Sequence, residues 1–144
     1  MKLTDLLGSF RSDKTGKSHL KNLIEMATAD GEFLQSEKEL LKTIAKRNGF
    51  SEAQLADIEK NSASVEFEPP KDEKQKFIQL YELVQMMNVD NQIHAKEQEL
   101  ARRFAVRFGY RQEVARDLVD AIKENIKNGS TVDETMKRTQ LMVS

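Results

Sequence analysis

The 144-residue chain has no cysteine. Disulfides, zinc–thiolate sites and cysteine nucleophiles are therefore excluded, and nothing in the sequence indicates an oxidising compartment. Long apolar runs are missing too, because no stretch approaches the roughly 18 apolar residues that a membrane span needs. Polar residues interrupt the leucines that follow Met1, so we expect no signal peptide. We predict a cytoplasmic protein with at most peripheral membrane association.

Glycine and proline are scarce, with 6 and 2 residues, while 38% of the chain is apolar and 33% is charged. This balance is typical of a water-exposed, mostly helical chain with a thin core. No segment alternates apolar and polar residues as a strand does. We therefore predict an all-α fold in a single domain. The net charge of −1 argues against a nucleic-acid partner, because neutralising phosphates requires a basic surplus.

The chain repeats itself at an offset of 60 residues. Residues 20–60 align with residues 80–120 without a gap, and 11 of the 41 aligned positions are identical. The identical pairs are Leu20/Leu80, Leu23/Leu83, Met26/Met86, Asp30/Asp90, Glu37/Glu97, Glu39/Glu99, Leu40/Leu100, Ala45/Ala105, Arg47/Arg107, Gly49/Gly109 and Asp57/Asp117. Such a repeat is typical of two copies of one supersecondary unit that share a core. We predict about seven helices, built from two tandem helix-turn-helix copies.

The predicted organisation follows the helical spacing and its interruptions. We expect a short helix over residues 1–10, a polar loop over 11–18, and a helix from about Ser18 to Asp30 that Gly31 ends. The divisions of the chain are an N-terminal helix and loop (1–17), a duplicated helical domain (18–128) made of copy one (18–60), a linker (61–70) and copy two (71–128), and a C-terminal helix or tail (129–144).

Helix boundaries are marked by capping residues and glycines. Three capping boxes are predicted, namely Ser36/Glu39, Ser51/Gln54 and Thr131/Glu134. Glycine ends helices because it accepts the left-handed conformation, and Gly49 and Gly109 are expected to do so. Asn91 stands where copy one has Gly31, and asparagine is the next best residue for such a turn.

Four carboxylates occupy equivalent turns of the two copies: Asp30, Glu37, Asp90 and Glu97. If the copies pack about a twofold axis, these side chains converge, and clustered carboxylate oxygens suit Ca²⁺, Mg²⁺ or Mn²⁺. The alternative is purely local, because aspartate favours turns and glutamate favours the first turn of a helix. An EF-hand is excluded, since its first two ligands would fall on Met26 and Thr28.

The run Ala29-Asp30-Gly31-Glu32-Phe33-Leu34-Gln35-Ser36-Glu37 resembles the signature turn of the tellurite-resistance TerB-like family. The match continues through residues 40–45 and 49–51, and copy two repeats it more loosely from Val89 to Tyr110. The resemblance covers about residues 18–125. It implies an all-helical fold of two duplicated halves and a metal site on Asp30, Glu37, Asp90 and Glu97. It also implies a role in tellurite and stress responses within multiprotein, often membrane-associated, assemblies.

Other motifs carry less information. Gly16-Lys17-Ser18 is not a P-loop, because Arg11 stands where the first glycine is required. His94 lies between Asp90 and Glu97, and whether it assists a site or is merely solvated stays open. A group of arginines is opposite in sign to the acidic stretch 52–73, and either steers a protein or lipid partner or forms a solvated helix face. These are Arg102, Arg103, Arg107, Arg111 and Arg116.

No nucleophile or catalytic base stands out in the sequence, so we predict no enzymatic activity. The predicted function is a non-enzymatic TerB-like module that binds a divalent cation, protein partners, or both. The alternative is a protein-interaction scaffold without metal. A small metal-dependent hydrolase is a third reading, and it requires a carboxylate cluster in a concave pocket.

Overall fold

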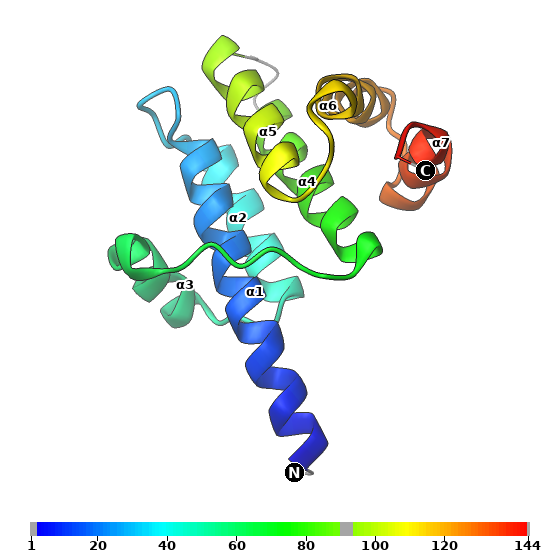
Figure 1. The fold of residues 1–144 in the computed structure, drawn as a ribbon. Helices are drawn as coiled ribbons and strands as arrows, with labels where there is room; N and C mark the ends of the chain where they lie inside the picture. Colours follow the sequence, from blue (N-terminus) through cyan, green and yellow to red (C-terminus); the bar gives the residue numbers. More distant parts are fainter. Residues whose placement is uncertain (1–2, 90–93, 144) are drawn as a thin grey trace.

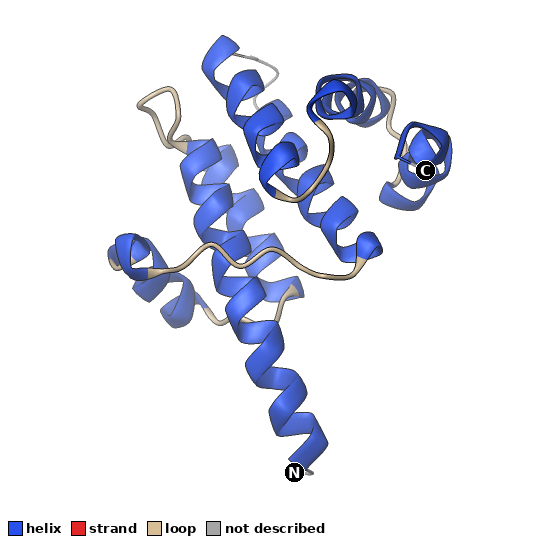
Figure 2. Ribbon diagram, in the orientation of Figure 1, coloured by secondary structure: helices blue, strands red, loops and turns tan. Residues whose placement is uncertain are grey.

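A computed structural model describes residues 3–89 and 94–143, with side chains described from Lys14 onward. Over these residues the chain is all helical, which confirms the predicted fold class (Figure 2). The helices are α1 (Leu3–Ala27), α2 (Gln35–Arg47), α3 (Glu52–Lys60), the short 3₁₀ helix η1 (Ser62–Ser64), α4 (Glu73–Asn88), α5 (Ala95–Arg107), α6 (Gln112–Lys127) and α7 (Val132–Val143). In the described part of the chain, no helix is long and apolar enough to cross a bilayer.

The prediction of two segments before Asp30 is wrong, because α1 runs without a break from Leu3 to Ala27. Residues 11–18 are polar, but none of them forbids a helix, and only Gly16 weakens one by about 1 kcal/mol. Gly16 is buried, and a Cβ atom there would lie 2.6 Å from Cε2 of Phe50. The glycine therefore lets Phe50 approach the helix and does not mark a loop. The N-terminal half of α1 extends beyond the other helices (Figure 1).

One helix of each half, α2 in the first and α5 in the second, has the same bounds at the 60-residue offset. Helix α2 covers residues 35–47, and α5 covers 95–107. Both helices end at a glycine in the left-handed conformation, with φ of 83° at Gly49 and 109° at Gly109. The residue after each glycine then donates its N–H to the carbonyl of Ala45 or Ala105, at 2.9 and 3.1 Å. The glycine stops are confirmed at both positions, since this turn requires a residue that tolerates positive φ.

Two of the three predicted capping boxes are confirmed. Ser51 and Gln54 exchange hydrogen bonds at the start of α3, and Thr131 and Glu134 do so before α7. The box predicted on Ser36 and Glu39 is wrong, because α2 already begins at Gln35. Glu37 acts instead, and its Oε1 accepts a hydrogen bond from the Leu34 N–H at 2.8 Å. Leu34 thus precedes the helix, two residues earlier than the Ser36 pattern predicts, and Ser36 lies inside the first turn.

Helices α1 and α4 pack against each other at the centre of the molecule (Figure 1). Six side chains from three identical pairs of the repeat are fully buried there: Leu20, Leu23, Met26, Leu80, Leu83 and Met86. Helices α2 and α3 cover this pair on one side, while α5 and α6 pack on α4. Burying each such side chain contributes about 1.5–3 kcal/mol, so this seam fixes where the turns at the ends of α1 and α4 lie.

The segment between α3 and α4 crosses α1 as an extended strap (Figure 1). Lys21 donates from Nζ to the Val65 carbonyl at 2.8 Å, and the Glu68 N–H donates to Ser18 Oγ at 2.8 Å. Phe67 stacks on Phe108 with ring centroids 5.9 Å apart. Polar and aromatic contacts thus hold the strap to both halves of the chain.

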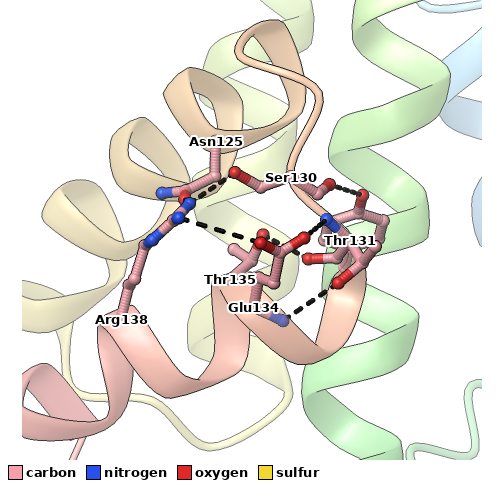
Figure 3. Close-up of polar contacts among 7 residues, drawn as sticks. Asn125, Ser130, Thr131, Glu134, Thr135 and Arg138 are labelled. Atoms are coloured by element: carbon pink, nitrogen blue, oxygen red, sulfur yellow. Dashed lines mark hydrogen bonds and ion pairs between the residues drawn. The ribbon is translucent and has the colours of Figure 1, made fainter.

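Helix α7 is tied to the rest of the fold by a polar cluster at its start (Figure 3). Arg138 donates to Asn125 Oδ1 and to Ser130 Oγ, so it links α7 to the end of α6. The Ser130 carbonyl also accepts from the Tyr81 hydroxyl at 3.0 Å. Hydrogen bonds from Thr131 lower the pKa of the Glu134 carboxyl, because they favour its charged form. Met136, on the same helix, is partly buried and packs against the core.

Candidate metal centre

The first half of the candidate site is the turn that follows α1. Gly31 adopts a φ of 89°, and the Glu32 N–H donates to Asp30 Oδ1 at 3.0 Å. This aspartate-centred turn fixes the carboxylate at the end of the helix through one of its two oxygens. The other oxygen, Oδ2, faces the second half of the chain. The Asp30 side chain is 14% exposed, so solvent has limited access to it.

The second half of the site is the start of α5. His94 is the residue that precedes the helix, and its backbone is extended, with φ −92° and ψ 145°. Glu97 lies in the first turn of α5 and is only 3% exposed. The positive end of a helix stabilises a carboxylate at this place. At the 60-residue offset, His94 corresponds to Leu34 and Glu97 to Glu37.

The two halves meet at His94. Its Nε2 atom lies 3.3 Å from Asp30 Oδ2 and 3.9 Å from Glu97 Oε1. One donor atom from each of the three residues lies within 4.8 Å of the other two. Metal–ligand distances of about 2.0–2.2 Å require the donors to move slightly inward around an ion. The arrangement is thus a three-donor cluster shared between the end of α1 and the start of α5.

The chemistry of this cluster suits a divalent cation. Two carboxylates face one imidazole, so the cluster carries a negative charge when His94 is neutral, and a neutral imidazole is the form that binds metal. The His94 side chain is 42% exposed, which leaves one side open to solvent. Water molecules on that side would complete the coordination of an ion that three protein atoms only partly surround.

The structure does not bring the four predicted carboxylates together in one cluster over the residues that it describes. Asp30 and Glu97 belong to the three-residue cluster. Glu37 is buried at the start of α2, where it accepts the Leu34 N–H, and the cluster that the described residues form does not include it. Asp90 lies outside the described residues. The symmetric four-carboxylate site therefore reduces, over the described chain, to two of its members and a histidine.

His94 is the site residue that the sequence hypothesis did not include in its ligand set. The repeat gave no reason to include it, because the equivalent position in the first half is the apolar Leu34. The available signal was its place between Asp90 and Glu97 in a polar turn, beside a glutamate that the repeat had already singled out.

Comparison with known protein families, with curated proteins and with solved structures found no match to this chain.

Proposed function

We propose that this chain is a non-catalytic, TerB-like helical module that binds a divalent cation between its two halves. The observation that carries the proposal is the contact of His94 Nε2 with Asp30 Oδ2 at 3.3 Å, with the buried Glu97 beside it. The three side chains come from the turn after α1 and from the start of α5, within stretches of the sequence that the repeat relates. The matching bounds of α2 and α5 and the Asp30-Gly31 turn support the TerB-like assignment.

Manganese is the ion that best fits the donor set. Imidazole favours zinc and other transition ions, whereas carboxylates favour Mg²⁺, Ca²⁺ and Mn²⁺. Mn²⁺ accepts both kinds of donor, so we place it ahead of Ca²⁺ and Mg²⁺, which prefer oxygen alone. Zn²⁺ also suits one histidine and two carboxylates, because it binds nitrogen and oxygen at similar distances.

An ion at this place joins the end of α1 to the start of α5. Its binding would therefore stabilise the packing of the two halves. The fraction of chains that carry the ion would follow the concentration of that ion, without a chemical reaction. In this proposal the module transmits the bound state to protein partners, in the manner of a stress-response assembly. The alternative scaffold function has no ion, and the cluster then serves only as an ion pair that holds the turns together.

Thermal unfolding with and without each ion tests the proposal. A ligand at 100 times its Kd stabilises the native state by about 2.7 kcal/mol, which raises the Tm of a chain of this length by roughly 5–10 °C. We expect Mn²⁺ or Zn²⁺ to raise the Tm of the chain, and we expect Asp30→Asn and His94→Gln to remove the rise. Asp117→Asn is the matched control, because Asp117 is exposed on α6. A scaffold without metal would give the same Tm with every ion.

A further inference from the structure

A hollow of about 920 Å³ lies between α5 and α6, which pack against each other. Its Arg107 end lies away from the candidate metal centre. Arg107 follows Glu97 by ten residues, which is about 15 Å along the helix axis at 1.5 Å per residue. The residues that line this α5–α6 groove are Glu99, Arg102, Arg103, Val106, Arg107, Gln112, Glu113, Ala115 and Arg116.

Four arginines and two glutamates line the α5–α6 groove, so it is basic in a chain whose net charge is −1. Two of the arginines have carboxylate partners: Arg103 lies 3.0 Å from Glu99, and Arg102 lies 3.4 Å from Asp120. Arg107 and Arg116 make no ion pair with any residue that the structure describes. These two guanidinium groups give the groove its unbalanced positive charge.

Arg107 is held in place by aromatic rings. Its Cζ lies 3.8 Å from the centroid of Phe67, and Phe67 stacks on Phe108. Stacking on a ring restricts the guanidinium and leaves its N–H groups able to bind a carboxylate through two parallel hydrogen bonds. Because the ring contact already restrains the side chain, binding a carboxylate there costs less conformational entropy than at a free arginine.

An apolar contact lies between these charges. Val106 is 45% exposed and is one of three large apolar side chains that stay exposed in the described chain. It precedes the stacked Arg107 and lines the same groove, with the buried Ala115 across from it on α6. The groove thus combines two cations without carboxylate partners with one apolar contact.

We propose that the α5–α6 groove binds an acidic peptide segment of a protein partner, with carboxylates on Arg107 and Arg116 and an apolar side chain on Val106. A nucleic acid fits less well, because Glu99 and Glu113 on the lining repel a continuous phosphate chain. A flat anionic membrane gains little from a hollow. The proposal needs no ion, so its test is independent of the test of the metal centre.

Fluorescence anisotropy of a labelled peptide tests this proposal. The probe is a fluorescein-labelled 12-residue peptide of glutamates with leucine at every fourth position, and a second probe carries glutamine in place of every glutamate. We expect saturable binding of the first probe and at least tenfold weaker binding of the second. Arg116→Glu, which changes no ring contact, should weaken binding at least tenfold, and Arg107→Glu, which also removes the contact with Phe67, should weaken it by at least the same factor.

Three controls separate the groove from net charge and from misfolding. Lys42→Glu with Lys46→Glu reverses two exposed charges on α2 and should change the affinity less than twofold. Arg107→Lys keeps the charge but loses the two-pronged donor, so we expect several-fold weaker binding. Asp30→Asn, which alters the metal centre, should leave the affinity unchanged. Circular dichroism checks that each variant is folded.

Several outcomes would overturn the proposal. Equal affinity for the two probes would show that the carboxylates of the peptide do not contribute to binding. An equal loss of affinity in the α2 control and in Arg116→Glu would mean that the peptide responds to net charge and not to the groove. Binding of phosphatidylserine vesicles or of single-stranded DNA that depends on Arg116, with no binding of the peptide, would assign the groove to another class of partner.

Discussion

His19 Nε2 lies 2.8 Å from Glu82 Oε1 in the buried seam between α1 and α4. The other Glu82 oxygen lies 2.9 Å from Arg47 Nη2 at the end of α2. At the 60-residue offset, His19 corresponds to Gln79 and Asn22 to Glu82. The counterpart of the His19–Glu82 pair is therefore Gln79–Asn22, and both of those side chains are also buried. Gln79 Oε1 and Asn22 Nδ2, an acceptor and a donor, have no hydrogen-bond partner among the residues that the structure describes.

The Glu82 carboxylate should be the polar group on which stability depends most. Glu82→Ala leaves His19 buried without its partner, and breaking a buried pair costs about 3–5 kcal/mol. Urea unfolding followed by circular dichroism measures the change. Glu99→Ala is the matched control, because its pair with Arg103 is exposed and is worth less than about 1 kcal/mol. Equal losses in the two variants would contradict the importance assigned to the seam.

The counterpart pair should behave in the opposite way. Gln79→Met together with Asn22→Leu removes both unpartnered polar groups at similar volume, and replacing such groups by apolar ones is neutral or stabilising. We expect the free energy of unfolding of the double variant to stay the same or rise. A loss above about 2 kcal/mol in urea unfolding would mean that a hydrogen bond or a bridging water joins the two side chains.

Gly16 should be intolerant of a side chain although it lies in a regular helix. In Gly16→Ala the new Cβ would meet the buried Phe50 ring at 2.6 Å, and overpacking of this kind costs about 1–3 kcal/mol. Phe50→Leu in the same chain should recover part of that loss, which a double-mutant cycle measures. If Gly16→Ala stabilised the protein, as it would in an open helix, the contact between α1 and Phe50 would be refuted.

Tyr110 should make stability fall at alkaline pH. Burial, with a smaller contribution from the Glu73 charge, raises the pKa of its hydroxyl to about 12. Because the folded value lies above the unfolded value of 10.0, the contribution is full below pH 10 and is lost as pH rises toward 12. Tyr110→Phe should show a shallower loss of stability over this range in urea unfolding. Identical pH profiles for the two proteins would show that Tyr110 is not the group responsible.

The predictable parts of the fold are those that local chemistry decides. Gly49 and Gly109 end their helices because few other residues adopt a positive φ, and that preference is visible in the sequence. The continuity of α1 was not predictable in this way. Gly16 reads as a loop signal, and its true role depends on Phe50, which lies 34 residues farther along the chain.

The residues of the candidate site also differ in whether the sequence alone could identify them. The repeat identified Asp30 and Glu97 because both copies carry the same carboxylates. It did not identify His94, because that position is Leu34 in the first copy, and its distance to Asp30 depends on how α1 packs against α4 and α5. Glu37 was included for its identity with Glu97, although it takes the local role of a helix cap.

Calorimetric titration of the metal-free chain with Mn²⁺, beside Asp30→Asn and Asp117→Asn, tests the metal centre most directly. We expect saturable binding of one ion per chain at micromolar concentration, lost in Asp30→Asn and retained in Asp117→Asn. Absence of heat with Mn²⁺ and Zn²⁺, or equal binding by all three proteins, would contradict it. The cluster of Asp30, His94 and Glu97 would then be an ion pair between two turns, and the chain a scaffold without metal.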